Sequence, residues 1–405
     1  MKAALHRKLT VLQVIPRLHA GGAELGCVQI AEALVAAGHR AIVASQGGRM
    51  VEQLKQAGAE HVTLPLASKN PLVMLLNIRR LARLIQGQSV DIVHARSRAP
   101  AWSALFAARM TGIALVTTYH GAYGDRGRLK NFFNGVMARG DMVIANSEFT
   151  ARLMRERHAP PEERLTVVHR GVDLGQFDPA KVGRERVAAL RAAWGLARDE
   201  RKILLLPARL TAWKGQETAV RAARALKEMK FANFVLVLAG SDQGRSGYRA
   251  RLEAMTAELD LHGTVLLVGH CDDMAAAYML ADVTLVPSTE PEAFGRTAAE
   301  SQAMGTPVVA SALGAVSETV LAPPDIEEDA RTGWRVPPGD AAALAAAAAA
   351  ALSLSPAAGA AMGLRGQAHA RASFALERMT ASTLAVYDRL LGTRLALGAG
   401  NRTVR

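Results

Sequence analysis

Cysteine and aromatic residues are scarce in this sequence. Only Cys27 and Cys271 occur in 405 residues, too few for a disulfide framework or a cysteine-rich zinc site, and they fit a reducing compartment. Aromatic residues make up 4% of the chain, which is poor for stacking on bases. With neither a zinc-finger spacing nor an RNP motif, the sequence predicts no nucleic acid partner.

Long apolar runs are missing as well. No stretch of about 18 apolar residues is present, so we expect no transmembrane helix, and the Ala-rich run 341–352 is predicted to be a helix packed on the protein surface. No cleavage signal follows the basic N-terminal residues, so we expect no signal peptide. Hydrophobic residues are 50% and charged residues 21% of the chain, as in folded proteins. We expect a cytoplasmic protein that attaches peripherally to the inner face of the plasma membrane.

Positive charge is unevenly distributed. The net charge is +13, and residues 1–175 hold 23 Lys and Arg against 12 Asp and Glu. Basic residues near an anionic leaflet contribute about 1 kcal/mol each, so a few that face one way would hold the protein on a membrane. A solvated basic surface and a nucleic acid partner are the alternatives that charge leaves open.

Short β-rich segments alternate with helical patterns, which predicts an α/β protein with two doubly wound parallel sheets. In the first half we expect strands at 9–16, 40–45, 61–66, 91–96, 114–120, 141–147 and 165–171. In the second half we expect them at 202–210, 234–240, 265–270, 283–288, 307–311 and 334–336. The expected domains are 1–175 and 176–375, with a hinge in 171–180, followed by a C-terminal helix and tail over 376–405.

Three segments carry groups suited to a nucleotide and a sugar. Gly21 and Gly22 follow a strand and open a helix, where free amides suit a phosphate, although a plain strand-to-helix turn gives the same pattern. Arg209 and Lys214 follow another strand and suit a diphosphate, or are two surface charges. Glu292 lies in a loop before a helix and can accept hydrogen bonds from sugar hydroxyls. Complementing the helix dipole explains Glu292 equally well.

Glu300 lies too far into that helix for the dipole to explain it. Glu292 and Glu300, followed by Gly-Thr-Pro-Val-Val-Ala-Ser at 305–311, resemble the retaining nucleotide-sugar glycosyltransferases of family four, and the resemblance covers almost the whole chain. Further matching segments are 21–24, 146–148, 171–173 with Phe177, 209–215, 268–269, Tyr278 and 281–282. The chain departs from the family pattern at Ala208 and at His169-Arg170, where glycine and Pro-Asn are usual.

The resemblance implies the GT-B fold, in which two Rossmann-like domains face each other across a cleft and a C-terminal helix crosses back toward the first domain. It also implies site residues. The catalytic set is His120, Glu292, Arg209 and Lys214. The donor-binding set is Gly21, Gly22, Arg209, Lys214, Gly240, His270, Glu292, Ala293, Phe294, Gly295 and Glu300. Glu292 would bind the donor sugar, Glu300 the ribose, and His120 would lie beside the reacting sugar, although a buried core histidine is the plain alternative.

No D-x-D motif is present, and Asp272 and Asp273 are merely adjacent. The resemblance implies that Arg209 and Lys214 take the place of a cation at the diphosphate. We therefore expect no essential metal and no cofactor besides the nucleotide sugar.

The acceptor is expected at the basic first domain. Arg96 and Arg98 end a strand, and the segment 123–139 begins with Tyr123 and places Phe132 and Phe133 among four cations. This pattern favours an anionic, lipid-linked or lipopolysaccharide-type acceptor at the membrane surface, with a surface loop as the alternative. The function predicted is transfer of a hexose-type sugar. A nucleotide-sugar epimerase of the same fold and a non-enzymatic basic membrane- or nucleic-acid-binding protein are the rivals.

Overall fold

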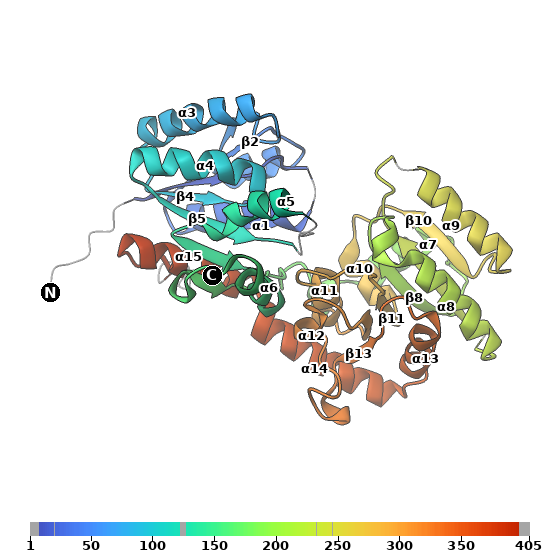
Figure 1. Cartoon of the computed structure of the whole chain (residues 1–405). Helices are drawn as coiled ribbons and strands as arrows, with labels where there is room; N and C mark the ends of the chain where they lie inside the picture. Colours follow the sequence, from blue (N-terminus) through green and yellow to red (C-terminus); the bar gives the residue numbers. More distant parts are fainter. Residues whose placement is uncertain (1–7, 20, 122–126, 232, 245, 397–405) are drawn as a thin grey trace. The chain divides into compact units, whose positions relative to one another are not determined.

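The computed structural model describes residues 8–19, 21–121, 127–231, 233–244 and 246–396 (Figure 1). Two compact units divide the chain. Unit 1 consists of Met1–Gly171 together with Leu376–Arg405, and unit 2 is Val172–Ala375. The predicted boundary lies after residue 175, and the prediction sets the segment from 376 apart.

The sheet of unit 1, as far as the described residues go, has seven parallel strands in the order β3-β2-β1-β4-β5-β6-β7. Their bounds are β1 (Thr10–Val14), β2 (Arg40–Ser45), β3 (Glu60–Thr63), β4 (Ile92–Ala95), β5 (Ala114–Tyr119), β6 (Met142–Ala145) and β7 (Leu165–Val167). Val11 pairs with Ala41 on one side and Ile92 on the other. The order reverses between β1 and β4, so this is a doubly wound sheet with a switch point there.

Unit 2 repeats this plan. Over its described residues, six parallel strands run in the order β10-β9-β8-β11-β12-β13. They are β8 (Lys202–Pro207), β9 (Phe234–Ala239), β10 (Val265–Gly269), β11 (Val283–Val286), β12 (Val308–Ser311) and β13 (Gly333–Val336). The switch point lies between β8 and β11. Every predicted strand overlaps an observed one, and the expected pair of doubly wound sheets is confirmed.

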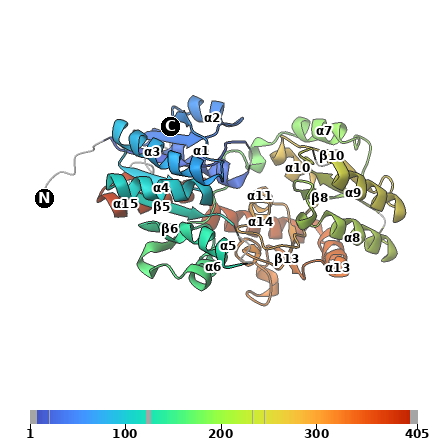
Figure 2. The same cartoon turned by 45° about the horizontal axis from the view of Figure 1, so that its top comes forward.

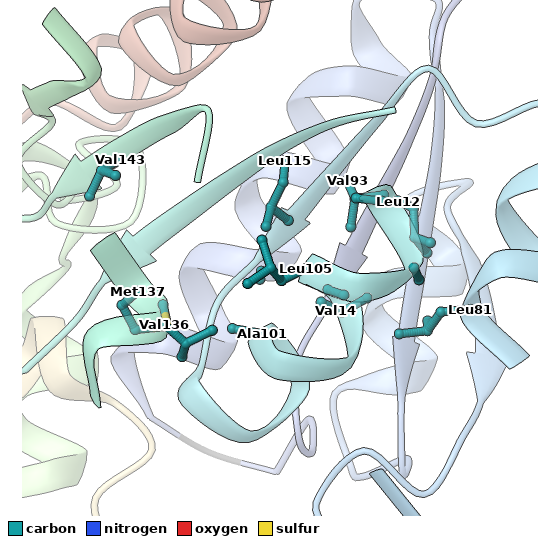
Figure 3. Packing of buried hydrophobic residues seen from close by; sticks show 14 of the residues in the cluster. Leu12, Val14, Leu81, Val93, Ala101, Leu105, Leu115, Val136, Met137 and Val143 are labelled. Atoms are coloured by element: carbon teal, nitrogen blue, oxygen red, sulfur yellow. The ribbon is translucent and has the colours of Figure 1, made fainter. Parts of the chain in front are cut away.

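Helices cover both faces of the unit 1 sheet (Figures 1 and 2). One face is packed by α3 (Pro71–Gly87), α4 (Arg98–Thr111) and α6 (Glu148–His158), with α5 (Arg128–Asn134) and the 3-10 helix η1 (Gly135–Ala138) beside α4. Figure 3 shows the core under α3 and α4, where Leu81 and Leu105 point toward Leu12, Val14, Val93 and Leu115 of the strands. The opposite face is packed by α1 (Gly22–Ala36), α2 (Val51–Gln56) and α15 (Leu376–Leu391).

The terminal helix α15 therefore belongs to the core of unit 1. Its buried residues Met379, Leu384 and Tyr387 pack with those of α1 and the strands. The predicted return of the chain to the first domain agrees with this packing.

Unit 2 is layered in the same way. One sheet face packs against α8 (Gln216–Glu228), α9 (Ser246–Glu258) and α13 (Ala341–Leu352), and the other against α7 (Arg184–Ala193), α10 (Met274–Leu280), α11 (Arg296–Ala303) and α14 (Pro356–Phe374), with α12 (Val316–Thr319) near α11. Length and apolarity would let none of the described helices cross a membrane alone. Only α13 and α14 taken together pass that test, and they are bent by 110°.

Candidate functional site

Three of the predicted donor residues of unit 2 lie at the carboxyl ends of β8 and β11, the two strands at its switch point. Arg209 and Lys214 follow β8, and Glu292 follows β11. Ligands of doubly wound sheets bind at this place. The topology of the second sheet therefore brings together residues that lie 78 positions apart in the sequence.

Lys214 and Glu292 form the centre of this group. The Lys214 ammonium donates to Glu292 Oε1 at 2.5 Å, and their side chains are 17% and 12% exposed. The Ser288 hydroxyl donates to the same oxygen at 2.6 Å. Lys214 Nζ also lies 4.1 Å from the centre of the Trp213 ring. A carboxylate and an ammonium thus neutralise each other while both remain within reach of solvent.

Glycines bring the loop after β8 against the end of β11. Gly215 has φ +74°, and a Cβ there would lie 1.8 Å from the Pro287 carbonyl oxygen. No residue other than glycine fits this position without a shift of the backbone. The amide of Thr289 donates to the Trp213 carbonyl at 2.8 Å. Gly240, after β9, is equally confined, because its Cβ would lie 1.8 Å from the carbonyl oxygen of Ala208. These contacts hold Lys214 at Glu292.

Glu300 is held from two sides inside α11. Arg296, one turn earlier, donates to Glu300 Oε1 at 2.5 Å, and the Tyr278 hydroxyl donates to Oε2 at 3.1 Å. Burial, and then the neighbouring Glu300 carboxylate, raise the pKa of Tyr278 well above 10.0, so its hydroxyl stays a donor. The side chain of Glu300 is 13% exposed.

The other predicted donor residues differ in burial. Phe294 is buried and packs edge-on against Phe374 of α14, with ring centres 5.2 Å apart. Ala293 is half-buried, and Gly295 has φ +84° directly before α11. Arg209 is exposed, and its guanidinium makes no ion pair with a described residue. His270, at the end of β10, is exposed beside Asp272.

In unit 1, the predicted residues Gly22 and His120 meet at Arg170. The Arg170 guanidinium donates to the Gly22 carbonyl, and its Nη2 donates to His120 Nδ1 at 2.9 Å. Since a guanidinium can only donate, His120 Nδ1 is the acceptor and the neutral ring carries its proton on Nε2. Burial, Arg170 and Arg96 hold the pKa of His120 well below 6.5. Its Nε2 is buried without a hydrogen-bond partner among the described residues.

Arg96 is buried, 5% exposed, rather than placed on the surface. Its Nε donates to Gln13 Oε1 at 2.5 Å, while its Nη2 has no partner in the part of the chain that the structure describes. Nearby His94 bonds through its two ring nitrogens to Tyr387 and Thr118, each at 2.6 Å. Unit 1 thus contains buried polar atoms, from Arg96 and His120, with unused hydrogen-bonding capacity.

The remaining predicted residues are Arg98 and Tyr123 of the acceptor set and Gly21 of the donor set. Arg98 Nη1 donates to Asn134 Oδ1 at 2.7 Å, which ties α4 to α5. Gly21, with φ +143°, precedes α1 and lies against Glu24. Tyr123 lies outside the described residues.

Sequence reasoning missed three supporting side chains. In the sequence, Arg170 is only a departure from the family pattern, Ser288 only ends the expected strand 283–288, and no role is predicted for Arg296. The i, i+4 spacing of Arg296 and Glu300 could have indicated their pair. No local signal indicates Arg170, whose contact with Gly22 spans 148 residues. Among the described residues, no group of three His, Cys, Asp or Glu could hold a metal ion.

Comparison with known proteins finds families and structures that match this architecture. Residues 20–176 match the model of Glycosyltransferase Family 4, and residues 191–365 that of Glycosyl transferases group 1. A crystal structure of a glycosyltransferase from Rickettsia africae ESF-5 is 32% identical, with a TM-score of 0.87, covering 96% of this chain and 100% of that one. A structure of Anabaena Alr3699/HepE in complex with UDP and glucose has a TM-score of 0.80 at 21% identity, over 94% of this chain and 100% of that one.

Curated relatives match over a shorter span. The D-inositol 3-phosphate glycosyltransferase of Salinispora arenicola (strain CNS-205) is 32% identical over 249 residues, which is 57% of this chain and 55% of that protein. The chain spans about half the length of the curated relatives it matches. The two family models, the full-length match to the Rickettsia enzyme and the paired doubly wound sheets agree, and the chain belongs to the group 1, family 4 glycosyltransferases with the GT-B fold.

Proposed function

We propose that this protein is a retaining hexosyltransferase that moves a sugar from a nucleotide-diphosphate sugar to an anionic, lipid-linked or lipopolysaccharide-type acceptor. The observation that carries the donor half is the Lys214–Glu292 pair at the switch point of unit 2. An ammonium suits a diphosphate and a carboxylate suits sugar hydroxyls. The pair therefore offers one charge to each part of the donor.

In the proposed reaction, Lys214 leaves Glu292 for the diphosphate, and Glu292 turns to the hydroxyls of the donor sugar. Arg209, exposed and without an ion pair to a described residue, adds a second cation for the diphosphate. Glu300, already oriented by Tyr278 and Arg296, accepts hydrogen bonds from the ribose. The backbone groups of Ala293–Gly295 complete the donor contacts.

The chemical step breaks the bond between the sugar C1 and the phosphate oxygen and forms the bond from the acceptor oxygen on the same face. The acceptor proton passes to the leaving phosphate. The transition state has oxocarbenium character, so cations that stabilise the departing diphosphate lower the barrier. His120, neutral with its proton on Nε2, keeps a hydrogen-bond donor that carries no net charge.

A second acceptor class is a soluble phosphorylated polyol. The specific observation in its favour is Arg96 Nη2, buried in unit 1 without a hydrogen-bond partner among the described residues. The curated relatives named above for inositol 3-phosphate support the same class. We rank it second because the outward surface of α3, α4 and α5 combines exposed apolar side chains with exposed cations.

A donor panel tests the proposal. The protein is incubated with UDP-, GDP- and ADP-sugars, with and without an acceptor, and nucleoside diphosphate release is measured. We expect slow release with one donor alone and faster release, with a new glycosidic product of retained configuration, when an anionic glycolipid is added. Acceleration by inositol phosphate instead of lipid would select the soluble class. Conversion of the donor sugar without release of nucleotide would point to an epimerase.

We also propose that the reaction needs no essential metal and takes place at the cytoplasmic face of the plasma membrane. The cations Arg209 and Lys214 support the first point, because they supply positive charge where a divalent ion would act. Turnover should survive excess chelator. Abolition by the chelator with rescue by Mn²⁺ would contradict this.

A further inference from the structure

The outward side of α3 in unit 1 is apolar where a surface helix is normally polar. Leu72, Leu75 and Leu76 are 70%, 59% and 48% exposed. Arg79 and Arg83 continue the same stripe one and two turns later, and both are exposed. The spacing places all five side chains on one face of the helix. This stripe is distinct from the buried side of α3, which carries Leu81 and Ile85.

Aromatic side chains from α4 and α5 extend this surface. Phe106 and Phe132 are 49% and 59% exposed. Their rings lie 6.3 Å and 5.4 Å from that of Trp102, which is half-buried between them. Figures 1 and 2 both show α3 running alongside α4. We call the surface formed by α3, α4 and α5 the apolar face.

A groove of about 470 Å³ crosses the apolar face, lined by residues that include Met74, Leu75, Ile78, Trp102, Phe106 and Phe132. Two of its polar side chains are already engaged. The Trp102 indole donates to the Phe133 carbonyl at 3.1 Å, and the Ser103 hydroxyl donates to the Met74 carbonyl at 2.9 Å. The groove therefore offers apolar surface and aromatic rings to an occupant, with little hydrogen-bonding capacity.

Exposed cations lie on or beside the helices that form the apolar face. Residues 61–140 contain eleven Lys and Arg and only two acidic residues, Asp91 and Asp125. Lys69, at the groove, and Arg79, Arg83 and Lys130 are exposed, and they make no ion pair with a described residue. The apolar face thus combines a hydrophobic centre with an unbalanced positive rim, which complements an anionic lipid surface.

We propose that the apolar face is the membrane-docking surface of the protein, and that its groove receives an acyl chain of an anionic phospholipid. The inference deepens the proposed function, because it names the surface that brings a lipid-linked acceptor to the enzyme. Leu72, Leu75 and Leu76 enter the boundary between headgroups and acyl chains. The cations of the rim lie among the anionic headgroups. Trp102 and Phe106 contact the chain in the groove.

Vesicle binding tests the proposal without donor or acceptor. The full chain is floated with vesicles of phosphatidylcholine alone, or of phosphatidylcholine with 30 mol% phosphatidylglycerol, at low and high salt. We expect binding to the anionic vesicles that weakens as salt screens the rim. Replacing Leu72, Leu75 and Leu76 by serine should weaken binding on the order of 100-fold. The double variant Arg79→Ser/Arg83→Ser should lose about fivefold per cation.

Matched controls lie in unit 2. Met229 and Leu364 are apolar and exposed, 52% and 66%, and the pair Met229→Ser/Leu364→Ser should leave binding unchanged. The exposed cations Arg198 and Arg371, replaced by serine, control for loss of net charge. All replaced side chains are exposed, so a thermal melt should show the wild-type transition. Equal weakening by the controls would overturn the assignment of the face.

Tryptophan quenching tests the groove itself. Vesicles with brominated acyl chains should quench part of the emission, and Trp102→Phe should abolish that part because the other tryptophans lie in unit 2. Undiminished quenching in Trp102→Phe would overturn the assignment of the groove. Absence of vesicle binding at low salt would overturn membrane docking. Dimers of the wild-type protein that become monomers in Leu72→Ser/Leu75→Ser/Leu76→Ser would assign the apolar face to a second copy of the chain instead. Donor turnover is measured separately, so a failure of catalysis is distinguishable from a failure of docking.

Discussion

Lys214→Met separates the structural role of the Lys214–Glu292 pair from its catalytic role. The two side chains are 17% and 12% exposed and 2.5 Å apart. Removing one member of a fully buried pair costs about 3–5 kcal/mol. Here Ser288 still donates to the same carboxylate oxygen, at 2.6 Å, and both groups reach solvent. We therefore expect Lys214→Met to lower the free energy of unfolding by about 2 kcal/mol.

The double variant Lys214→Met/Glu292→Gln makes the comparison decisive. It removes both charges, so we expect most of the lost stability to return. Turnover should not return, because the cation that stabilises the leaving diphosphate is still missing. The loss in kcat should be on the order of 10²–10³-fold in Lys214→Met, similar to the loss of one transition-state donor in other enzymes. It should be at least as large in the double variant, because Glu292 also binds the donor sugar in the proposed function.

The assays are urea unfolding followed by tryptophan fluorescence, and a continuous measurement of nucleoside diphosphate release. Lys202→Met is the matched control, because Lys202 forms a 2.8 Å pair with Asp282 that is 51% and 31% exposed. It should cost at most about 1 kcal/mol and leave turnover intact. Wild-type turnover in Lys214→Met would refute its role at the diphosphate. Strictly additive stability losses would refute the coupling to Glu292.

Three further predictions concern Arg170, His120 and Gly215. Arg170→Gln removes a cation that lowers the pKa of His120, so that pKa should rise toward 6.5. The acid limb of the pH–rate profile should then move to higher pH, and an unchanged limb would show that Arg170 does not control the protonation of His120. Because His120 stays neutral in the folded protein while the unfolded chain takes up a proton below pH 6.5, this one residue should lower the free energy of unfolding by about 1.4 kcal/mol for each pH unit below 6.5. His120→Gln should remove this contribution, measured by urea unfolding at pH 7.0 and 5.5. Gly215→Ala should unfold the loop or abolish turnover, since its Cβ would overlap the Pro287 carbonyl, whereas Gly263→Ala, with φ +66° and open space, should cost only about 1–2 kcal/mol in a thermal or urea melt; equal effects would contradict the steric argument.

The strands and the donor residues of unit 2 could be predicted because their signals are local. A buried strand followed by a glycine or a charged residue is readable within ten positions, as at Lys214 and Glu292. Contacts between distant segments give no such signal. The bond from His94 to Tyr387 joins residues 293 positions apart.

Exposure was the other quantity that the sequence could not give. Leu75 and Leu81 occupy the same helix and have the same side chain. Leu81 is buried in the core and Leu75 is 59% exposed. Periodicity marks both stripes as apolar, and only the position of neighbouring elements decides which of them is covered.

The discontinuity of unit 1 bears on how the protein is made. Unit 2 is one uninterrupted stretch, Val172–Ala375, whereas unit 1 needs both ends of the chain. On the ribosome, the first unit to begin emerging is thus the last to be completed, because Leu384 and Tyr387 of its core are synthesised after all of unit 2. A chain that stops at residue 375 would leave the later half able to fold and the earlier half without its closing helix. Nascent unit 1 therefore exposes the apolar surface that α15 covers until the last part of the chain has been synthesised. We expect chaperones to bind the nascent chain at this surface.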